Sequence, residues 1–242
     1  TMWFGTYYGG LDYYNPHTDI FEYNNLKLGH AGIGPVISKI IEDKTGRIWI
    51  STEGDGLVSY LPETDAYTYY TKENNTISHN NIKTLYYDDT SSTIWIGTHL
   101  GGLCSYSIDR KEFKHFTIDP SDHTKRSEIV QAIIRHKNIL YLGTLSGVYY
   151  MNLEDGSIQK IHLLDKYIYA VNSLMIDKQD NLWIGGNNLC YYSIKQNYVR
   201  SLDKYLAKIT ASSKNTITSL IQDNSNRIIA TTLGAGILIY HP

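Results

Sequence analysis

The stretch Ile94-Trp95-Ile96-Gly97-Thr98 decides the fold, because versions of it return along the chain at a nearly fixed interval. The copies are 2–6 (MWFGT), 48–52 (IWIST), 94–98 (IWIGT), 140–144 (LYLGT), 182–186 (LWIGG) and 228–232 (IIATT). Their second residues stand at positions 3, 49, 95, 141, 183 and 229, so the intervals are 46, 46, 46, 42 and 46 residues. This period predicts an array of similar structural units.

A second phrase precedes the last five copies. It has two apolar residues three positions apart and, three positions later, an aspartate or once a histidine: Ile37, Ile40, Asp43; Ile82, Leu85, Asp88; Val130, Ile133, His136; Val171, Leu174, Asp177; Ile217, Leu220, Asp223. Residues three apart lie on opposite faces of a strand, so we expect this strand to be buried on both faces. The polar residues that follow, such as 44–46 (KTG) and 224–226 (NSN), predict a hairpin into the tryptophan strand.

Two further strands follow the tryptophan strand in most repeats. A turn that contains glycine comes first, as at 54–57 (GDGL) and 101–103 (GGL), where glycine permits positive φ angles. The third strand is marked by Tyr14, Tyr60, Tyr106 and Tyr240, and the fourth by Phe21, Tyr67, Phe113, Ile158 and Val199. Each repeat is therefore predicted to be a four-stranded antiparallel meander.

Four short strands in a unit of this length are typical of a propeller blade. We therefore predict an all-β β-propeller of four-stranded antiparallel blades, with six recognisable repeats. The blades span about 1–30, 31–76, 77–122, 123–166, 167–210 and 211–242, in a single propeller domain or fragment over 1–242. Blade one starts inside its second strand and blade six stops after its third, so we expect a part of a longer array. Trp3, Trp49, Trp95 and Trp183 are interpreted as structural residues that fill the space between blades.

Composition argues against several classes of partner. The chain has 22 basic and 24 acidic residues and no cluster of Lys or Arg that could follow phosphates, so nucleic acid is not expected. No apolar run is long enough for membrane insertion by this segment, and the first residues lack the pattern of a signal peptide. Cys104 and Cys190 hold equivalent places in non-adjacent repeats, so we expect two buried free thiols.

The combined pattern resembles the two-component regulator propeller repeat. The clearest copy runs from Ser78-His79-Asn80-Asn81-Ile82 through 94–98 to Gly101-Gly102-Leu103 and Tyr106. That family forms the sensor regions of hybrid two-component systems in glycan-degrading bacteria, outside the inner membrane and ahead of a transmembrane helix and a histidine kinase. The resemblance implies a periplasmic sensor-domain propeller that binds a glycan fragment, or relays its binding to a kinase on the parent chain.

Departures from this repeat fall in blades four to six. Tyr141 and Ile229 replace the tryptophan, His136 replaces the aspartate, and Asn187-Asn188 stands in place of Thr-x-x-Gly-Gly. The sequence as given shows no kinase, receiver or DNA-binding module. We therefore expect a sensor without enzyme activity of its own, whose output comes from other parts of a parent chain.

In a propeller, the loops between second and third strands share one face with the segments that lead into the first strands, and this face usually carries the binding site. The candidate ligand-binding residues there are Tyr7, Tyr8, His30, Glu53, Asp55, His79, Asn80, His99, Asn187 and Asn188. Aromatic rings stack on apolar sugar faces, and amides and carboxylates pair with hydroxyls, so an oligosaccharide or polysaccharide fragment is the predicted ligand. For each residue taken alone, an ordinary solvated loop position is the alternative.

Metals and cofactors are not expected. Neither His-x-His nor Cys-x-x-Cys spacing occurs. Asp43, Asp88, Asp177 and Asp223 lack the ligand series of a calcium loop and are interpreted as turn residues.

Two other functions stay open. A scaffold for protein–protein interaction, including a homodimer, would associate without any small-molecule ligand. An enzyme similar to the propeller streptogramin lyase, which uses a histidine with a metal, is a weaker alternative, because no nucleophile elbow or fixed His–Glu pair can be recognised here.

Overall fold

A computed structural model describes residues 1–7, 9–24, 36–74, 76–203, 206 and 216–241. It confirms the predicted class, because the fold is an all-β propeller of six blades with three or four antiparallel strands each. One short 3-10 helix, η1 (His162–Leu164), lies among the described residues. Contacts divide the chain into two compact units, Thr1–Thr117 with blades 1 to 3 and Ile118–Pro242 with blades 4 to 6.

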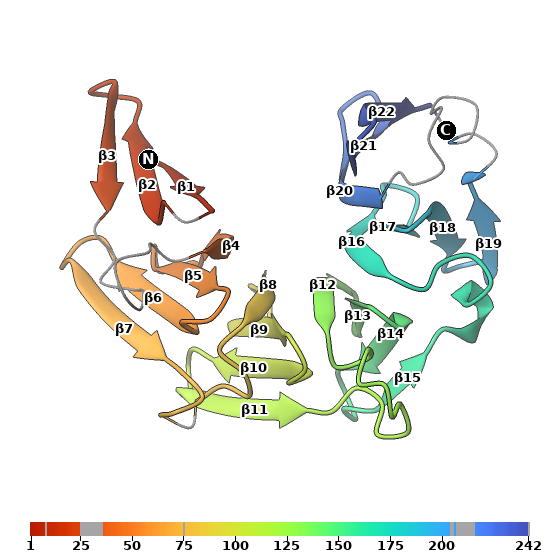
Figure 1. The fold of residues 1–242 in the computed structure, drawn as a ribbon, viewed down its shortest axis with the longest axis horizontal. Helices are drawn as coiled ribbons and strands as arrows, with labels where there is room; N and C mark the ends of the chain where they lie inside the picture. Colours follow the sequence, from red (N-terminus) through yellow and green to blue (C-terminus); the bar gives the residue numbers. More distant parts are fainter. Residues whose placement is uncertain (8, 25–35, 75, 204–205, 207–215, 242) are drawn as a thin grey trace. The chain divides into compact units, whose positions relative to one another are not determined.

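The first unit contains three sheets whose strands pair in sequence order (Figure 1). Blade 1 consists of β1 (Met2–Gly5), β2 (Leu11–Asn15) and β3 (Ile20–Asn24). Blade 2 consists of β4 (Ile37–Glu42), β5 (Ile48–Thr52), β6 (Leu57–Leu61) and β7 (Ala66–Tyr70). Blade 3 consists of β8 (Ile82–Asp88), β9 (Thr93–Thr98), β10 (Leu103–Ser107) and β11 (Glu112–Phe116).

The second unit has the same organisation. Blade 4 consists of β12 (Val130–His136), β13 (Ile139–Thr144), β14 (Gly147–Asn152) and β15 (Ile158–Lys160). Blade 5 consists of β16 (Val171–Ile176), β17 (Asn181–Gly186), β18 (Leu189–Ser193) and β19 (Tyr198–Ser201). Blade 6 consists of β20 (Thr216–Gln222), β21 (Ile228–Leu233) and β22 (Gly236–Tyr240). Each of the six sheets lies inside one of the residue ranges expected for a blade.

A β-bulge in the first strand of blades 2 to 6 corrects one inference from the sequence. In blade 3, Ile82 pairs with Thr98 and Leu85 pairs with Ile96, and Lys83 is the extra residue. Thr98 and Ile96 are two residues apart on β9, so they share a face, and their partners Ile82 and Leu85 share it too. The same register shift lies between Ile37 and Lys39, Val130 and Ala132, Val171 and Ser173, and Ile217 and Ser219. The expectation that the two apolar positions lie on opposite faces was wrong, because one extra residue inverts the alternation.

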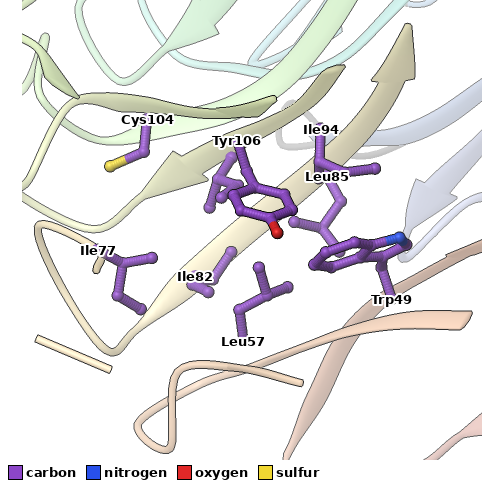
Figure 2. Packing of buried hydrophobic residues seen from close by; sticks show 9 residues of the cluster. Trp49, Leu57, Ile77, Ile82, Leu85, Ile94, Cys104 and Tyr106 are labelled. Atoms are coloured by element: carbon purple, nitrogen blue, oxygen red, sulfur yellow. The ribbon is translucent and has the colours of Figure 1, made fainter. Parts of the chain in front are cut away.

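Blades within a unit pack through two kinds of apolar face. We call the face that carries the tryptophan position the outgoing face, and the face that carries the two apolar residues of the first strand the incoming face. Between blades 2 and 3, Trp49 and Leu57 from the outgoing face pack against Ile82, Leu85 and Tyr106 of the incoming face (Figure 2). Trp49 is 1% exposed, and its ring centroid lies 5.3 Å from that of Tyr106.

The other tryptophans occupy the same position of their blades. Trp183 of blade 5 belongs to a cluster with Ile217 and Leu220 of blade 6, and its ring lies 5.7 Å from that of Tyr240. Trp3 of blade 1 lies 5.7 Å from Tyr60 of blade 2. Trp95 is buried and contacts Phe116 of its own blade at 5.9 Å.

Glycine two residues after the tryptophan position allows the next blade to approach. A Cβ on Gly185 would lie 2.5 Å from Ile217 Cγ2, and one on Gly143 would lie 2.4 Å from Val171 Cγ1. Both distances are far below carbon–carbon contact. At these two positions the glycine therefore makes room for a β-branched residue of the next blade.

Asp43 and Asp177 close their turns and also accept a hydrogen bond from the indole. Asp43 Oδ1 accepts a hydrogen bond from Thr45 N–H at 2.8 Å, and its Oδ2 accepts one from Trp49 Nε1–H at 2.8 Å. The bond from Trp183 Nε1–H to Asp177 Oδ2 is 2.7 Å. The aspartate therefore links the turn to the inter-blade core, which the sequence analysis did not foresee.

Both cysteines are buried and free, as expected. Cys104 Sγ lies 3.0 Å from Ser78 Oγ and 3.2 Å from His115 Nδ1. Burial raises the pKa of the Cys104 thiol, and it raises the pKa of Cys190 to about 12. Both thiols are therefore protonated at neutral pH, which disfavours a nucleophilic role.

Candidate functional site

The loop between the second and third strands is shaped by the threonine that ends the tryptophan phrase. Thr52 Oγ1 donates to Gly56 O at 2.9 Å and accepts from Asp55 N–H at 3.0 Å. Gly56 has φ +83°, and a Cβ on it would lie 2.4 Å from Tyr70 O. Equivalent bonds join Thr6 to Gly10, Thr98 to Gly102, Thr144 to Gly147 and Thr232 to Gly236. The backbone of these loops is therefore held the same way, and the side chains between are free to differ.

In the unit Thr1–Thr117, the loop of blade 2 is tied to the segment that leads into β8. Glu53 and Asn81 form an isolated antiparallel bridge. Gly56 N–H donates to Asn80 O at 2.9 Å, and His99 N–H donates to Asn81 O at 2.9 Å. Two loops from neighbouring blades therefore meet at residues 80 and 81. We call residues 53–56, 78–81 and 98–102 the blade 2–3 corner.

Charged and amide side chains at this corner are paired with each other. Asn80 Nδ2 donates to the two carboxylate oxygens of Glu73 at 3.0 and 2.8 Å, and Asn80 Oδ1 accepts from Lys72 N–H at 2.7 Å. The bond from Asn80 lowers the pKa of the Glu73 carboxyl group. Lys83 Nζ lies 2.9 Å from Glu53 Oε1. Glu53 and Asn80 are therefore oriented by neighbours that the sequence analysis did not include.

Two histidines lie beside this network. The rings of His79 and His99 are 5.9 Å apart and meet edge to face. His79 Nδ1 accepts from Asn81 N–H at 3.0 Å, which assigns the proton of the neutral ring to Nε2. Burial lowers the pKa of His79, and His99 and Lys72 lower it further.

Two buried polar atoms at the corner have no hydrogen-bond partner among the described residues, His99 Nδ1 and Asn81 Oδ1. Buried polar groups are nearly always hydrogen-bonded to protein or water. The corner therefore has unused hydrogen-bonding capacity of the kind that a buried water molecule satisfies.

The structure brings together five of the predicted residues, Glu53, Asp55, His79, Asn80 and His99, in the blade 2–3 corner. Tyr7, also in this unit, is 71% exposed. Tyr8 and His30 lie outside the described residues.

Asn187 and Asn188 belong to the other unit and hold the segment that leads into β16. Asn187 Oδ1 accepts from the N–H groups of Tyr169 and Ala170 at 3.1 and 3.0 Å. Asn188 is 5% exposed and donates through Nδ2 to Tyr167 O at 3.0 Å. The Asn187 amide oxygen and the Asn188 amide nitrogen are therefore occupied by backbone partners.

Sequence reasoning missed Glu73, Asn81 and Lys83. Lys83 is the extra residue of the bulge in β8, and the repeated apolar spacing by itself gives no sign of that bulge. Asn81 stands in the run that was quoted for the family resemblance, directly after two predicted residues. Glu73 gave no signal, because its partner Asn80 is reached only through the fold.

The part of the chain that the structure describes contains no group of three His, Cys, Asp or Glu residues placed to hold a metal ion. Among the same residues, no helix has the length and apolar character needed to span a membrane.

Comparison with known proteins bears on the family of the repeats. Residues 32–54 and 162–188 match the family described as "Two component regulator propeller". No curated protein matches the sequence.

Solved structures share the fold along nearly the whole chain. The extracellular domain of the hybrid two-component system BT3049 from B. thetaiotaomicron has a TM-score of 0.76 and 22% identity, covering 98% of this chain and 31% of that one. The extracellular domain of BT4673 from the same organism has a TM-score of 0.80 and 18% identity, covering 99% and 31%. PorZ, a surface component of the type-IX secretion system of Porphyromonas gingivalis, has a TM-score of 0.71 and 14% identity, covering 98% and 36%.

The chain thus spans about a third of the length of these structures. Its two matching segments lie in different units of the fold, one leading into and including part of blade 2 and the other reaching through β17 of blade 5. The repeated tryptophan phrase, the antiparallel blades and these matches lead to one conclusion: the chain is a β-propeller in which two segments, 32–54 and 162–188, match the two-component regulator propeller family.

Proposed function

We propose that this chain is the extracytoplasmic, periplasmic sensor-domain propeller of a hybrid two-component regulator. The observation that carries the proposal is the match to the regulator propeller repeat, in a fold similar to extracellular domains of such systems over 98% of the chain. In this role the propeller detects a ligand and the output belongs to a kinase elsewhere on a parent chain. The segment itself is a sensor rather than an enzyme.

The proposed ligand is a glycan fragment bound at the blade 2–3 corner, directly or through a relay between blades. The corner combines the Glu53 carboxylate, the Asn80 amide and the His79 and His99 rings within one unit. A sugar hydroxyl group both donates and accepts, so it suits the carboxylate, amide and imidazole groups of the corner. Several such groups converging on one site are typical of sugar recognition.

Thermal unfolding of the purified chain with a panel of plant and host oligosaccharides tests this proposal. A ligand at 100 times its Kd adds roughly 2.7 kcal/mol, and each kcal/mol raises the midpoint of a domain of this size by roughly 2 to 4 °C. We expect a saturable shift for one class of sugar. No shift with any sugar would contradict direct glycan binding.

Two matched pairs of variants then locate the site. His99→Ala and Glu53→Ala should weaken the glycan-dependent shift while the midpoint without sugar stays nearly constant. The controls are His17→Ala and Glu63→Ala, which change exposed residues of the same unit away from the corner. Equal losses of stability and of binding in the corner variants would remove His99 and Glu53 from the site.

One observation favours a second candidate, a scaffold for protein association without a small-molecule ligand. On the outgoing face of blade 6, Ile221 is 57% exposed and Ile237 is 66% exposed. Apolar side chains gathered on one face suit a protein partner or a second copy of the chain. Sedimentation velocity should then show association that depends on concentration and is lost in Ile237→Lys. A monomer at all concentrations would count against the homodimer.

A further inference from the structure

The ring of His79 closes a turn of its own backbone. His79 Nδ1 accepts from Asn81 N–H, two residues further on, at 3.0 Å. Asparagine and aspartate side chains close Asx-turns with the same spacing. The peptide segment that His79 holds is also the one to which both loops of the corner are bonded, through Gly56 N–H to Asn80 O and His99 N–H to Asn81 O. The state of one ring therefore bears on the contact between blades 2 and 3.

Only a ring with a lone pair on Nδ1 can accept this bond. The imidazolium form carries N–H on both nitrogens. Protonation would therefore place the N–H of His79 against the N–H of Asn81 and replace a hydrogen bond with repulsion between two donors. The turn cannot stay as it is when His79 takes up a proton.

The surroundings of His79 oppose its protonation as well. The ring faces His99, and Lys72 adds a nearby positive charge, so among the described residues a proton on His79 has no compensating carboxylate partner. The carboxylate of Glu73 is bonded to Asn80, and that of Glu53 is paired with Lys83.

The loops of blades 2 and 3 adjoin the segment that contains His79. Asp55 lies in the facing loop of blade 2, where its N–H is bonded to Thr52. A Cβ on Gly101 would lie 3.0 Å from His79 Cβ. The Cβ of His79 therefore packs against the loop of blade 3 at Gly101.

We propose that His79 is a proton-operated latch of the blade 2–3 corner. The neutral ring holds residues 79–81, and with them the loops of blades 2 and 3, and mild acid releases them. One consequence rests on the sensor function proposed above: glycan recognition at the corner would weaken as the pH falls.

The direction in which pH changes the stability follows from the thermodynamic linkage between protonation and folding. The folded state lowers the pKa of His79. The stabilisation by the neutral ring is therefore complete above the ordinary histidine pKa of about 6.5, and it is lost as the pH falls from there toward the lowered value.

Replacement of His79 by asparagine separates the hydrogen bond from the titration. In His79→Asn the amide oxygen can accept from Asn81 N–H in an Asx-turn, but it cannot be protonated in this pH range. Thermal midpoints of the full chain are measured at pH 7.5 and pH 5.0. We expect acid to lower the wild-type midpoint by roughly 2 to 4 °C more than that of His79→Asn, the size expected for one lost hydrogen bond.

Two further variants complete the comparison. His17→Asn removes an exposed histidine of the same unit and should respond to acid as the wild type does. His79→Ala removes the acceptor and should lower the midpoint at both pH values. Equal acid responses of the wild type and His79→Asn would overturn the proposal.

A local measurement on the wild type decides the question even if a variant fails to fold. The imidazole of His79 and the amide of Asn81 are followed by NMR as the pH is lowered. We expect both signals to change with one midpoint below about 6.5. An Asn81 amide that does not respond while the ring titrates would refute the latch. Because none of these measurements uses a sugar, the result is independent of whether the glycan proposal holds.

Discussion

Blades 5 and 4 lie in the same unit and build the turn between their first two strands differently. In blade 5, Asp177 Oδ1 accepts from the N–H groups of Gln179 and Asn181 at 2.9 and 2.8 Å. Its second oxygen accepts from Trp183 Nε1–H at 2.7 Å. One carboxylate therefore satisfies both the turn and the buried indole.

Blade 4 has neither the aspartate nor the tryptophan of this arrangement. His136 pairs directly with Ile139, so only two residues form the turn and no long loop needs a side-chain cap. Tyr141 takes the tryptophan position and is 5% exposed. His136 Nε2 lies 3.7 Å from Asp180 Oδ1 in the turn of blade 5. Where the turn shortens, the aspartate and the indole are both replaced.

Two other blades show which role of the aspartate comes first. In blade 6, which lacks the tryptophan, Asp223 Oδ2 accepts from Arg227 Nε–H at 2.6 Å. In blade 3, Asp88 Oδ2 accepts from Ser91 Oγ–H at 2.6 Å, and Trp95 Nε1 has no partner among the described residues. The aspartate therefore primarily serves the turn, and its second oxygen binds whichever donor is nearest.

The largest expected effect comes from removing the indole of blade 5. Trp183→Ala should lower the free energy of unfolding by roughly 3 to 5 kcal/mol, because it leaves a cavity between blades 5 and 6. Urea unfolding followed by circular dichroism measures this loss. Trp183→Phe, which keeps a ring in the core, should cost less. An unchanged midpoint for Trp183→Ala would show that the blades do not depend on this residue.

A smaller effect is expected from the carboxylate. Asp177→Ala should cost roughly 1 to 3 kcal/mol, because the buried indole N–H loses its acceptor along with the turn. Asp223→Ala is the matched control, since it loses the same turn bonds and only a half-exposed arginine partner. A double-mutant cycle of Asp177→Ala with Trp183→Phe should show coupling. Equal costs at positions 177 and 223, with no coupling, would separate the aspartate from the indole.

The smallest effect concerns the hydroxyl group that replaces the indole in blade 4. Burial raises the pKa of Tyr141 to about 12, with Tyr192 and Tyr150 adding to it. The neutral phenol is favoured in the folded state, so its stabilisation is complete below the ordinary pKa of about 10 and is lost as the pH rises toward 12. Tyr141→Phe cannot ionise and should lose less stability between pH 10 and 12, while it changes little at pH 7. Parallel alkaline denaturation curves for the two proteins would contradict this prediction.

The sequence predicted the blades because the signals that define them are local. Alternating apolar residues, glycine at the turns and aspartate at the hairpins act within a few neighbouring residues. The pairing of Tyr106 with Phe113 and of Tyr60 with Tyr67 places marker residues of the third and fourth strands side by side, as the repeat alignment implied. Repetition strengthened each signal, because a pattern that recurs at the same position of several repeats does not arise by chance.

The wrong prediction that the first strand of each blade is buried on both faces has a physical cause. Spacing alone does not distinguish a regular strand buried on both faces from a bulged strand buried on one. In blade 3 the bulge at Lys83 brings Ile82 and Leu85 to the same face, where both pack against blade 2. Only the pairing with β9 reveals the extra residue.

The candidate site was predictable as a set of loops and not as a set of contacts. The sequence placed Glu53, His79, Asn80 and His99 on one face of the propeller. It gave no indication that Asn80 binds Glu73, that Glu53 pairs with Lys83, or that the His79 ring accepts from its own backbone.

The sequence by itself determined the period, the all-β class, the six repeats and the turns, because these depend on backbone preferences and on apolar alternation over a few residues. The tertiary structure decided the shared face of the bulged strands, the glycine that admits the next blade, the choice of donor for each aspartate and the hydrogen bonds of the blade 2–3 corner. These depend on distances between residues that meet only when blades pack, and sequence spacing does not encode such distances.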